Sequence, residues 1–208
     1  MTVDDCFLCS PDQRLIYEMG GDFFAMLGIG PIVEGYSIIA TKDHIPSTMD
    51  LSLEKAEKLS RFTKHIRSRL KPYYGKVIIT EHGRVNLGGD PVDNSEHSKH
   101  CLHAHRLVFP INTDLTPKLC EFDLPIMEYP SFLEARRNFD WGDEYLYFER
   151  TDGSCVVTRA PLELARLFFR KSLAEYVGKP EIADWRQFPR HQLVEEALDK
   201  IKKNNKLN

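Results

Sequence analysis

The chain has 208 residues, 42% of them hydrophobic, which is enough for one sizeable core. Its net charge of −3 excludes a global basic field for nucleic-acid backbones, and no apolar run has transmembrane length. The five cysteines are unevenly spaced and the amino terminus does not resemble a signal peptide, which argues against a secreted disulfide framework. We therefore expect a cytoplasmic protein that binds neither membranes nor nucleic acid.

Two cysteines near the start, Cys6 and Cys9, form a Cys-x-x-Cys motif. Two thiolates spaced this closely can reach one ion, and such a pair is the commonest half of a zinc site. A redox-active pair is expected between a strand and the start of a helix, but no strand is predicted ahead of Cys6. The motif therefore favours metal binding, with two ordinary thiols as the alternative.

Two strands are predicted next, over residues 22–27 and 36–41, joined by a segment rich in glycine. We expect them to pair antiparallel. His44 follows the second strand directly, where a side chain can turn into a site; the alternative is a place on the surface. An amphipathic helix is predicted over residues 53–70, with apolar side chains three or four apart, and Pro72 is expected to end it.

A third strand is predicted over residues 76–80, and Glu81-His82-Gly83 is expected to close it. The segment 84–95 that follows is rich in glycine, asparagine and aspartate, so it is expected to be a loop. Binding groups concentrate in loops that a rigid scaffold holds. Four neighbouring side chains here offer donors for an anion: Asn94, Ser95, Ser98 and Lys99.

Four of the chain's eight histidines fall within nine residues, namely His97, His100, His103 and His105. The second half of this stretch alternates and then turns apolar up to Phe109, which predicts a strand that enters the core. Strand side chains repeat every second residue, so His103 and His105 are expected on one face. A core strand has little reason to carry two imidazoles, so the pair indicates a site; the alternative is two hydrogen-bonded core histidines.

The second half of the chain is less regular until Ser131, where a short helix is predicted to begin. Residues 144–150 and 155–159 alternate on either side of a turn and predict a β-hairpin. Two further helices are expected, over residues 161–177 and 191–202. No linker separates the halves, so we expect one extended domain.

The run His-Ala-His-Arg-Leu-Val-Phe-Pro at residues 103–110 resembles the signature of the histidine-triad (HIT) superfamily, in which His-x-His-x-His precedes apolar residues. Three further motifs follow that family's order. Residues 30–44 are similar to its Pro-x-x-x-Gly…Lys-x-His region. Residues 81–83 resemble the Glu-His-Gly of one branch, and residues 6–9 match its zinc-binding members. The resemblance covers roughly residues 5–112.

This resemblance implies an α+β fold, with an antiparallel sheet of about five strands and helices packed on it. Residues 1–112 would form that HIT-like domain, and residues 113–208 an extension that packs on it with the β-hairpin and helices. The extension is similar to those of the Glu-His-Gly branch. Its functional prediction is a phosphate- or carboxylate-binding set, with ordinary surface ion pairs as the alternative: Arg166, Arg170 and Arg186.

The resemblance also implies residue roles. His105 takes the place of the middle histidine, which the family uses as a nucleophile on the α-phosphorus of a nucleotide. The implied zinc ligands, a closed structural set, are Cys6, Cys9, His44 and His103. His97 and His100 are rival ligands. The implied partners are a nucleotide, a nucleotide sugar or a dinucleoside polyphosphate, and the family suggests a homodimer.

The sequence departs from the family at two positions. Leu107 stands in the third histidine place, so the proton or phosphate contact of that position must come from elsewhere, with Arg106, His100, Lys99 and His82 as candidates. Gly28 stands where an acidic residue often holds the ribose. The catalytic candidates are His105, His103 and His100. The candidates for nucleotide and phosphate binding are Glu81, His82, Asn94, Ser98, Lys99 and Arg106, although Arg106 has the opposite strand parity.

The predicted function is therefore that of a nucleotide-phosphate hydrolase or nucleotidyltransferase that forms a covalent nucleotidyl-histidine. One alternative is a catalytically inactive nucleotide-binding or sensing module of the same fold. Another is a zinc-stabilised interaction protein that binds no nucleotide.

Overall fold

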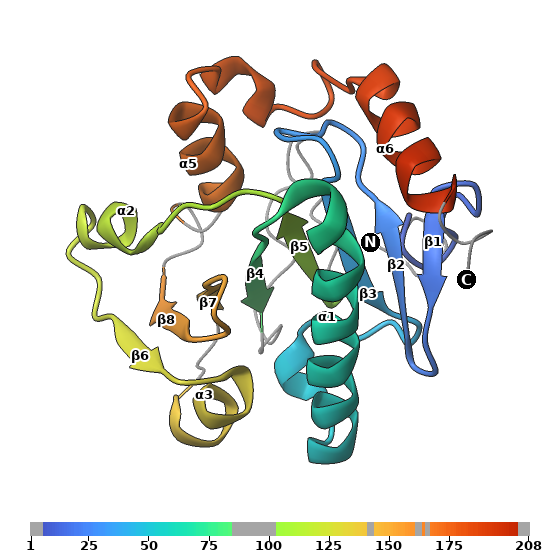
Figure 1. Ribbon diagram of the computed structural model, residues 1–208. Coiled ribbons are helices and arrows are strands. Elements are labelled where there is room, and N and C mark those ends of the chain that lie inside the picture. Colours follow the sequence, from blue (N-terminus) through green and yellow to red (C-terminus); the bar gives the residue numbers. More distant parts are fainter. Residues whose placement is uncertain (1–5, 85–102, 141–143, 161–163, 165–166, 204–208) are drawn as a thin grey trace.

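The computed structural model describes residues 6–84, 103–140, 144–160, 164 and 167–203. Within these ranges, strands and helices make an α+β fold built on one antiparallel sheet (Figure 1). Eight strands lie in the order β1-β2-β3-β5-β4-β7-β8-β6. They are β1 (Ile16–Met19), β2 (Phe23–Leu27), β3 (Ser37–Thr41), β4 (Ile78–Arg84), β5 (His105–Phe109), β6 (Met127–Tyr129), β7 (Glu144–Glu149) and β8 (Cys155–Arg159).

The helices occupy both faces of this sheet. They are α1 (Leu53–Tyr74), α2 (Thr116–Cys120), α3 (Phe132–Asn138), α5 (Phe168–Tyr176) and α6 (His191–Lys203), with 3₁₀ turns η2 (Thr48–Asp50) and η3 (Pro180–Ala183). Helices α1, α3 and α6 pack on one face, and α5 and the amino-terminal loop pack on the other. None of the described helices is long and apolar enough to span a membrane.

The predicted α+β class is confirmed, and the β2–β3 pair and the β7–β8 hairpin lie where they were expected. Helix α1 begins as predicted, with the Ser52 hydroxyl accepting a hydrogen bond from the Lys55 backbone. It runs past Pro72, which was expected to end it. The helix stops at Gly75 instead, where a φ of 74° turns the chain into the left-handed region.

Strand β4 is longer than its sequence predicted. It continues through Glu81-His82-Gly83, because β7 pairs with it from Ile79 to Arg84 and supplies the backbone partners that keep it extended. A side chain on Gly83 would overlap the ring of Tyr145, so this close approach of β4 and β7 requires a glycine there.

The second half of the chain completes the sheet. Strand β7 hydrogen-bonds to β4, and β8 and β6 continue the sheet beyond it. This is why the sheet has eight described strands, where about five had been expected for the first half alone. The two predicted parts, residues 1–112 and 113–208, meet within this sheet at the β4–β7 pair.

The arginines of the carboxy-terminal segment were predicted to bind an anion or to lie on the surface. Arg170 does neither, because it is buried and donates to the backbone oxygens of Gly30 at 2.7 Å and Ala183 at 3.0 Å. It ties this segment to the first half of the chain. Arg186 lies over the ring of Trp185, 4.6 Å from its centroid. Arg166 lies outside the described residues.

Candidate functional site

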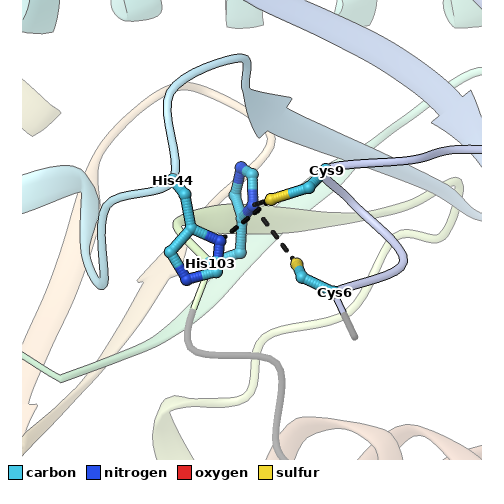
Figure 2. Close-up of side chains that lie close together, drawn as sticks. All are labelled: Cys6, Cys9, His44 and His103. Carbon is cyan, nitrogen blue, oxygen red and sulfur yellow. Dashed lines mark hydrogen bonds between the residues drawn. The ribbon is translucent and has the colours of Figure 1, made fainter. Parts of the chain in front are cut away.

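Four side chains from three separate segments meet at one end of strands β3 and β5 (Figure 2). Cys6 and Cys9 come from the amino-terminal loop, His44 follows β3, and His103 precedes β5. One ligand atom of each lies within 4.8 Å of all the others. The Sγ of Cys9 is 3.0 Å from Nδ1 of His44, and Nδ1 of His103 is 3.4 Å from both sulfurs.

Backbone hydrogen bonds bring these segments together. The N–H of Thr41 donates to the carbonyl of Ala104 at 3.2 Å, and the N–H of Ala104 donates to the carbonyl of Ile45 at 2.6 Å. The end of β3 is thereby fastened to the start of β5, so His44 and His103 must be neighbours. The predicted strand starts later than expected, at His105, and His103 lies just outside it.

The orientation of the His103 ring suits a metal ligand. Its Nε2 lies 2.7 Å from the carbonyl oxygen of Thr41 and donates to it, which leaves the lone pair of Nδ1 facing the two thiols. Burial lowers the pKa of His103 below its ordinary value and so favours the neutral ring, the form that binds metal.

The donor set fits a cation. Burial and then the neighbouring Cys6 raise the pKa of the Cys9 thiol, because two adjacent thiolates repel each other without a positive charge between them. A divalent cation reverses this repulsion. Two sulfurs and two imidazole nitrogens complete a tetrahedral site without an open position. The four residues chosen from the sequence therefore lie together and can hold a metal ion.

His105 has a different setting, although it is only two residues away. It is half-buried and opens strand β5. Its Nδ1 lies 2.6 Å from the carbonyl oxygen of His103 and donates to it, so the lone pair is on Nε2. Burial lowers the pKa of His105 below its ordinary value, which favours the neutral ring.

His82 and Glu144 contact each other on the sheet face that His105 shares. They lie on adjacent strands, β4 and β7, and His82 Nε2 contacts a carboxylate oxygen of Glu144. His82 was predicted from the sequence as a site residue, whereas Glu144 was not. The partners are 62 residues apart, and only the register of β4 against β7 brings them together, so no local signal in the sequence identifies this pair.

Glu81 and Arg106, which were predicted to bind nucleotide or phosphate, pair with each other inside the protein. Both side chains are 1% exposed, and Arg106 Nε donates to Glu81 at 3.1 Å. Glu81 also accepts from the hydroxyls of Thr48 and Tyr145, each at 2.6 Å. The strand alternation that the sequence already indicated points Arg106 to the α1 face, whereas His105 points to the α5 face.

The two positions that depart from the family pattern, Leu107 and Gly28, both lie in packed surroundings. Leu107 lies opposite Thr80 on β4 and packs into the apolar cluster of the α5 face. Gly28 lies against the ring of Tyr36, which leaves no room for a side chain. The remaining candidates lie outside the described residues: Asn94, Ser95, His97, Ser98, Lys99 and His100.

No protein-family model matches this sequence. The chain is 26% identical over 204 residues to zinc finger CCCH domain-containing protein 64 of Arabidopsis thaliana, covering 88% of this chain and 32% of that protein. It is 22% identical over 207 residues to CWF19-like protein 1 of Mus musculus, covering 93% of this chain and 36% of that protein. The chain thus spans about a third of the length of the curated relatives it matches.

Solved structures give distant likenesses. Yeast Ap4A phosphorylase in complex with AMP aligns with a TM-score of 0.43 and 12% identity, over 74% of this chain and 64% of that one. A hypothetical histidine triad nucleotide-binding protein from Sulfolobus tokodaii aligns with a TM-score of 0.39 and 12% identity, over 96% and 95%. Scores this low do not carry a function from these proteins to this chain.

Proposed function

We propose that this chain is a nucleotide-phosphate hydrolase or nucleotidyltransferase of the histidine-triad type, with His105 as its nucleophile. The observation that carries the proposal is the 2.6 Å hydrogen bond from His105 Nδ1 to the carbonyl of His103. It fixes the tautomer that presents a lone pair on Nε2. A neutral, oriented imidazole is the form that attacks phosphorus.

The reaction has two displacements. In the first, the Nε2 lone pair forms a bond to the α-phosphorus, and the bond from phosphorus to the leaving group breaks with its electron pair. The positive charge on the phosphorylated ring is stabilised by the Nδ1–H bond to the carbonyl of His103. In the second, water or another hydroxyl attacks the same phosphorus, and the pair of the P–N bond returns to Nε2.

The metal in this proposal is a structural Zn²⁺ held by Cys6, Cys9, His44 and His103. When bound, it supplies a rigid cross-link between the amino-terminal loop and the ends of β3 and β5. His105 lies two residues beyond His103, so the same cross-link fixes the carbonyl that orients its ring. The substrate classes we propose are nucleotide phosphoramidates, nucleotide sugars and dinucleoside polyphosphates, with Asn94, Ser98, Lys99 and His100 as candidate phosphate contacts.

The test is turnover of these three substrate classes by the wild type, by His105→Ala and by His191→Ala. His191 is an exposed histidine at the start of α6 and serves as the matched control. We expect the His105 variant to lose at least about 10³-fold in kcat/KM, the order that follows loss of a covalent nucleophile. Equal rates for His105→Ala and wild type would remove His105 from the mechanism.

An inactive nucleotide-binding module is the second candidate, and Leu107 favours it because a leucine can neither donate nor accept a hydrogen bond. In that case nucleoside monophosphates raise the melting temperature, since a ligand that binds only the folded state stabilises it. No substrate class then gives turnover or a covalent adduct. A melting temperature unchanged by every nucleotide would instead favour an interaction protein that binds none.

A further inference from the structure

The His82–Glu144 pair lies on the same sheet face as His105. In the β4–β7 ladder His82 is opposite Leu146, so Glu144, two residues along, is a diagonal neighbour on that face. Their side chains are 19% and 13% exposed, so the pair is mostly shielded from solvent without being sealed. The contact of the Glu144 carboxylate with His82 Nε2 orients the His82 ring.

The neighbouring ladder brings this pair to His105. Strands β4 and β5 are antiparallel, with Thr80 opposite Leu107. Two residues further along β4 is His82, and two residues back along β5 is His105, so antiparallel pairing carries the two histidines toward each other on one face.

On this face, the residue at the third position of the triad cannot donate a proton. Leu107 is apolar, and the nearby Glu81 and Arg106 are locked together on the opposite face. An amine or alkoxide that leaves phosphorus needs a proton, because its conjugate acid has a high pKa. Among the described residues that share the face of His105, His82 carries an imidazole, the side chain that most often transfers protons in catalysis.

We propose that His82, positioned by Glu144, is the proton donor and acceptor of this reaction, an inference that rests on the proposed function. As His105 Nε2 bonds to phosphorus, the imidazolium of His82 gives its Nδ1 proton to the departing oxygen or nitrogen. His82 becomes neutral and keeps its Nε2–H bond to Glu144. In the second displacement, neutral His82 takes a proton from the attacking water, the P–N bond breaks, and both rings return to their starting states.

The inference predicts a dependence on the leaving group. A nucleoside 5′-phosphoramidate releases an amine that needs a proton, whereas a nucleoside 5′-(4-nitrophenyl) phosphate releases a stable phenolate that does not. Loss of a general acid costs about 10²–10⁴-fold where protonation is needed. We therefore expect His82→Gln to lose that much with the phosphoramidate. With the 4-nitrophenyl ester it should keep a fast first release of phenolate and then turn over slowly.

The decisive experiment is a pre-steady-state burst measurement with both substrates, using wild type, His82→Gln, Glu144→Gln and His105→Ala, each checked for an unchanged melting temperature. A wild-type phenolate burst retained in His82→Gln, with slowed release from the nucleotidyl-enzyme, supports the inference. Glu144→Gln should show the same difference between the two substrates, with a smaller loss of rate on the phosphoramidate. A series of substituted phenyl esters should show a steeper dependence on leaving-group pKa in His82→Gln, which a merely structural role would not produce.

Two outcomes separate this inference from the proposed function. If His82→Gln slows the first release of the leaving group equally for both substrates, or changes the kinetics of neither, the proton-transfer role is overturned. The wild-type burst would then still support His105 as nucleophile. If the wild type gives no burst and no turnover, or His105→Ala retains the burst, the proposed function itself is overturned, and the inference with it.

Discussion

Two histidines separated by one residue have opposite orientations because each ring is fixed by a different backbone carbonyl. His103 donates from Nε2 to Thr41 and presents Nδ1 to the thiols, whereas His105 donates from Nδ1 to His103 and presents Nε2. The first arrangement suits a metal ligand and the second a nucleophile. At this scale a role is decided by which ring nitrogen carries the proton.

Gly83 gives a prediction at the same scale. The ring of Tyr145 fills the space that a side chain would need, so Gly83→Ala should lower the free energy of unfolding by about 1–3 kcal/mol through overpacking. Gly21→Ala is the control, because a Cβ there meets nothing within 4 Å. Urea denaturation of both variants measures the difference. Equal stability of the two variants would contradict the close packing of β4 against β7.

At the scale of elements, the metal cluster and a buried ion pair join segments that lie far apart in the sequence. The cluster links the amino-terminal loop to β3 and β5. On the other face, Glu81 of β4 binds Arg106 of β5, the η2 turn through Thr48, and Tyr145 of β7. The strand that carries His105 is therefore held from both faces.

Removal of one metal ligand tests the first of these links. We expect wild-type protein to contain about one zinc per chain and Cys9→Ser to contain almost none, since the site has four ligands and no spare position. The melting temperature of Cys9→Ser should fall by roughly 10 °C or more, because each kcal/mol of lost stability lowers it by about 2–4 °C in a chain of this size. Elemental analysis and calorimetry measure both.

Cys120→Ser is the matched control, because Cys120 is exposed and lies outside the cluster. It should keep its zinc and its melting temperature. Wild-type protein purified with intact cysteines but no metal would contradict the structural-zinc proposal.

The buried ion pair gives the second prediction for elements. Arg106→Met leaves the Glu81 carboxylate buried without its cation, which typically costs about 3–5 kcal/mol. Adding Glu81→Gln to it should recover part of that loss, because no uncompensated charge then remains. Chemical denaturation of the single and double variants measures the coupling. Additive losses would show that the two side chains do not act as a pair.

The whole molecule is one sheet to which both halves of the chain contribute. Truncation after residue 112 would remove β7, β8 and β6 and leave the hydrogen-bonding edge of β4 open along its length. We expect this fragment to aggregate or remain unfolded, because an exposed long edge and an uncovered core are both unfavourable. Far-UV circular dichroism and sedimentation measure this. A monomeric, cooperatively folded fragment would contradict the prediction.

In the whole molecule, the features that the sequence could predict are those set by local patterns. The set Cys6, Cys9, His44 and His103 was implied by the resemblance to the histidine-triad superfamily, whose motifs are local patterns in the sequence. Strand β1 and strand β6 were missed, because both are short edge strands with little alternation. The β4–β7 pairing, and with it Glu144, depends on long-range register that local periodicity does not encode. The homodimer stays a prediction, which light scattering of the purified chain measures.

The central claim is that His105 becomes covalently nucleotidylated. The most direct measurement is intact-mass spectrometry of the wild type mixed with a nucleoside 5′-(4-nitrophenyl) phosphate and quenched rapidly in base, which preserves a phosphorus–nitrogen bond. The account predicts a mass increase of one nucleoside monophosphoryl group, located on His105 by peptide mapping and absent from His105→Ala. Phenolate release by the wild type without any such adduct, or the same adduct in His105→Ala, would contradict it.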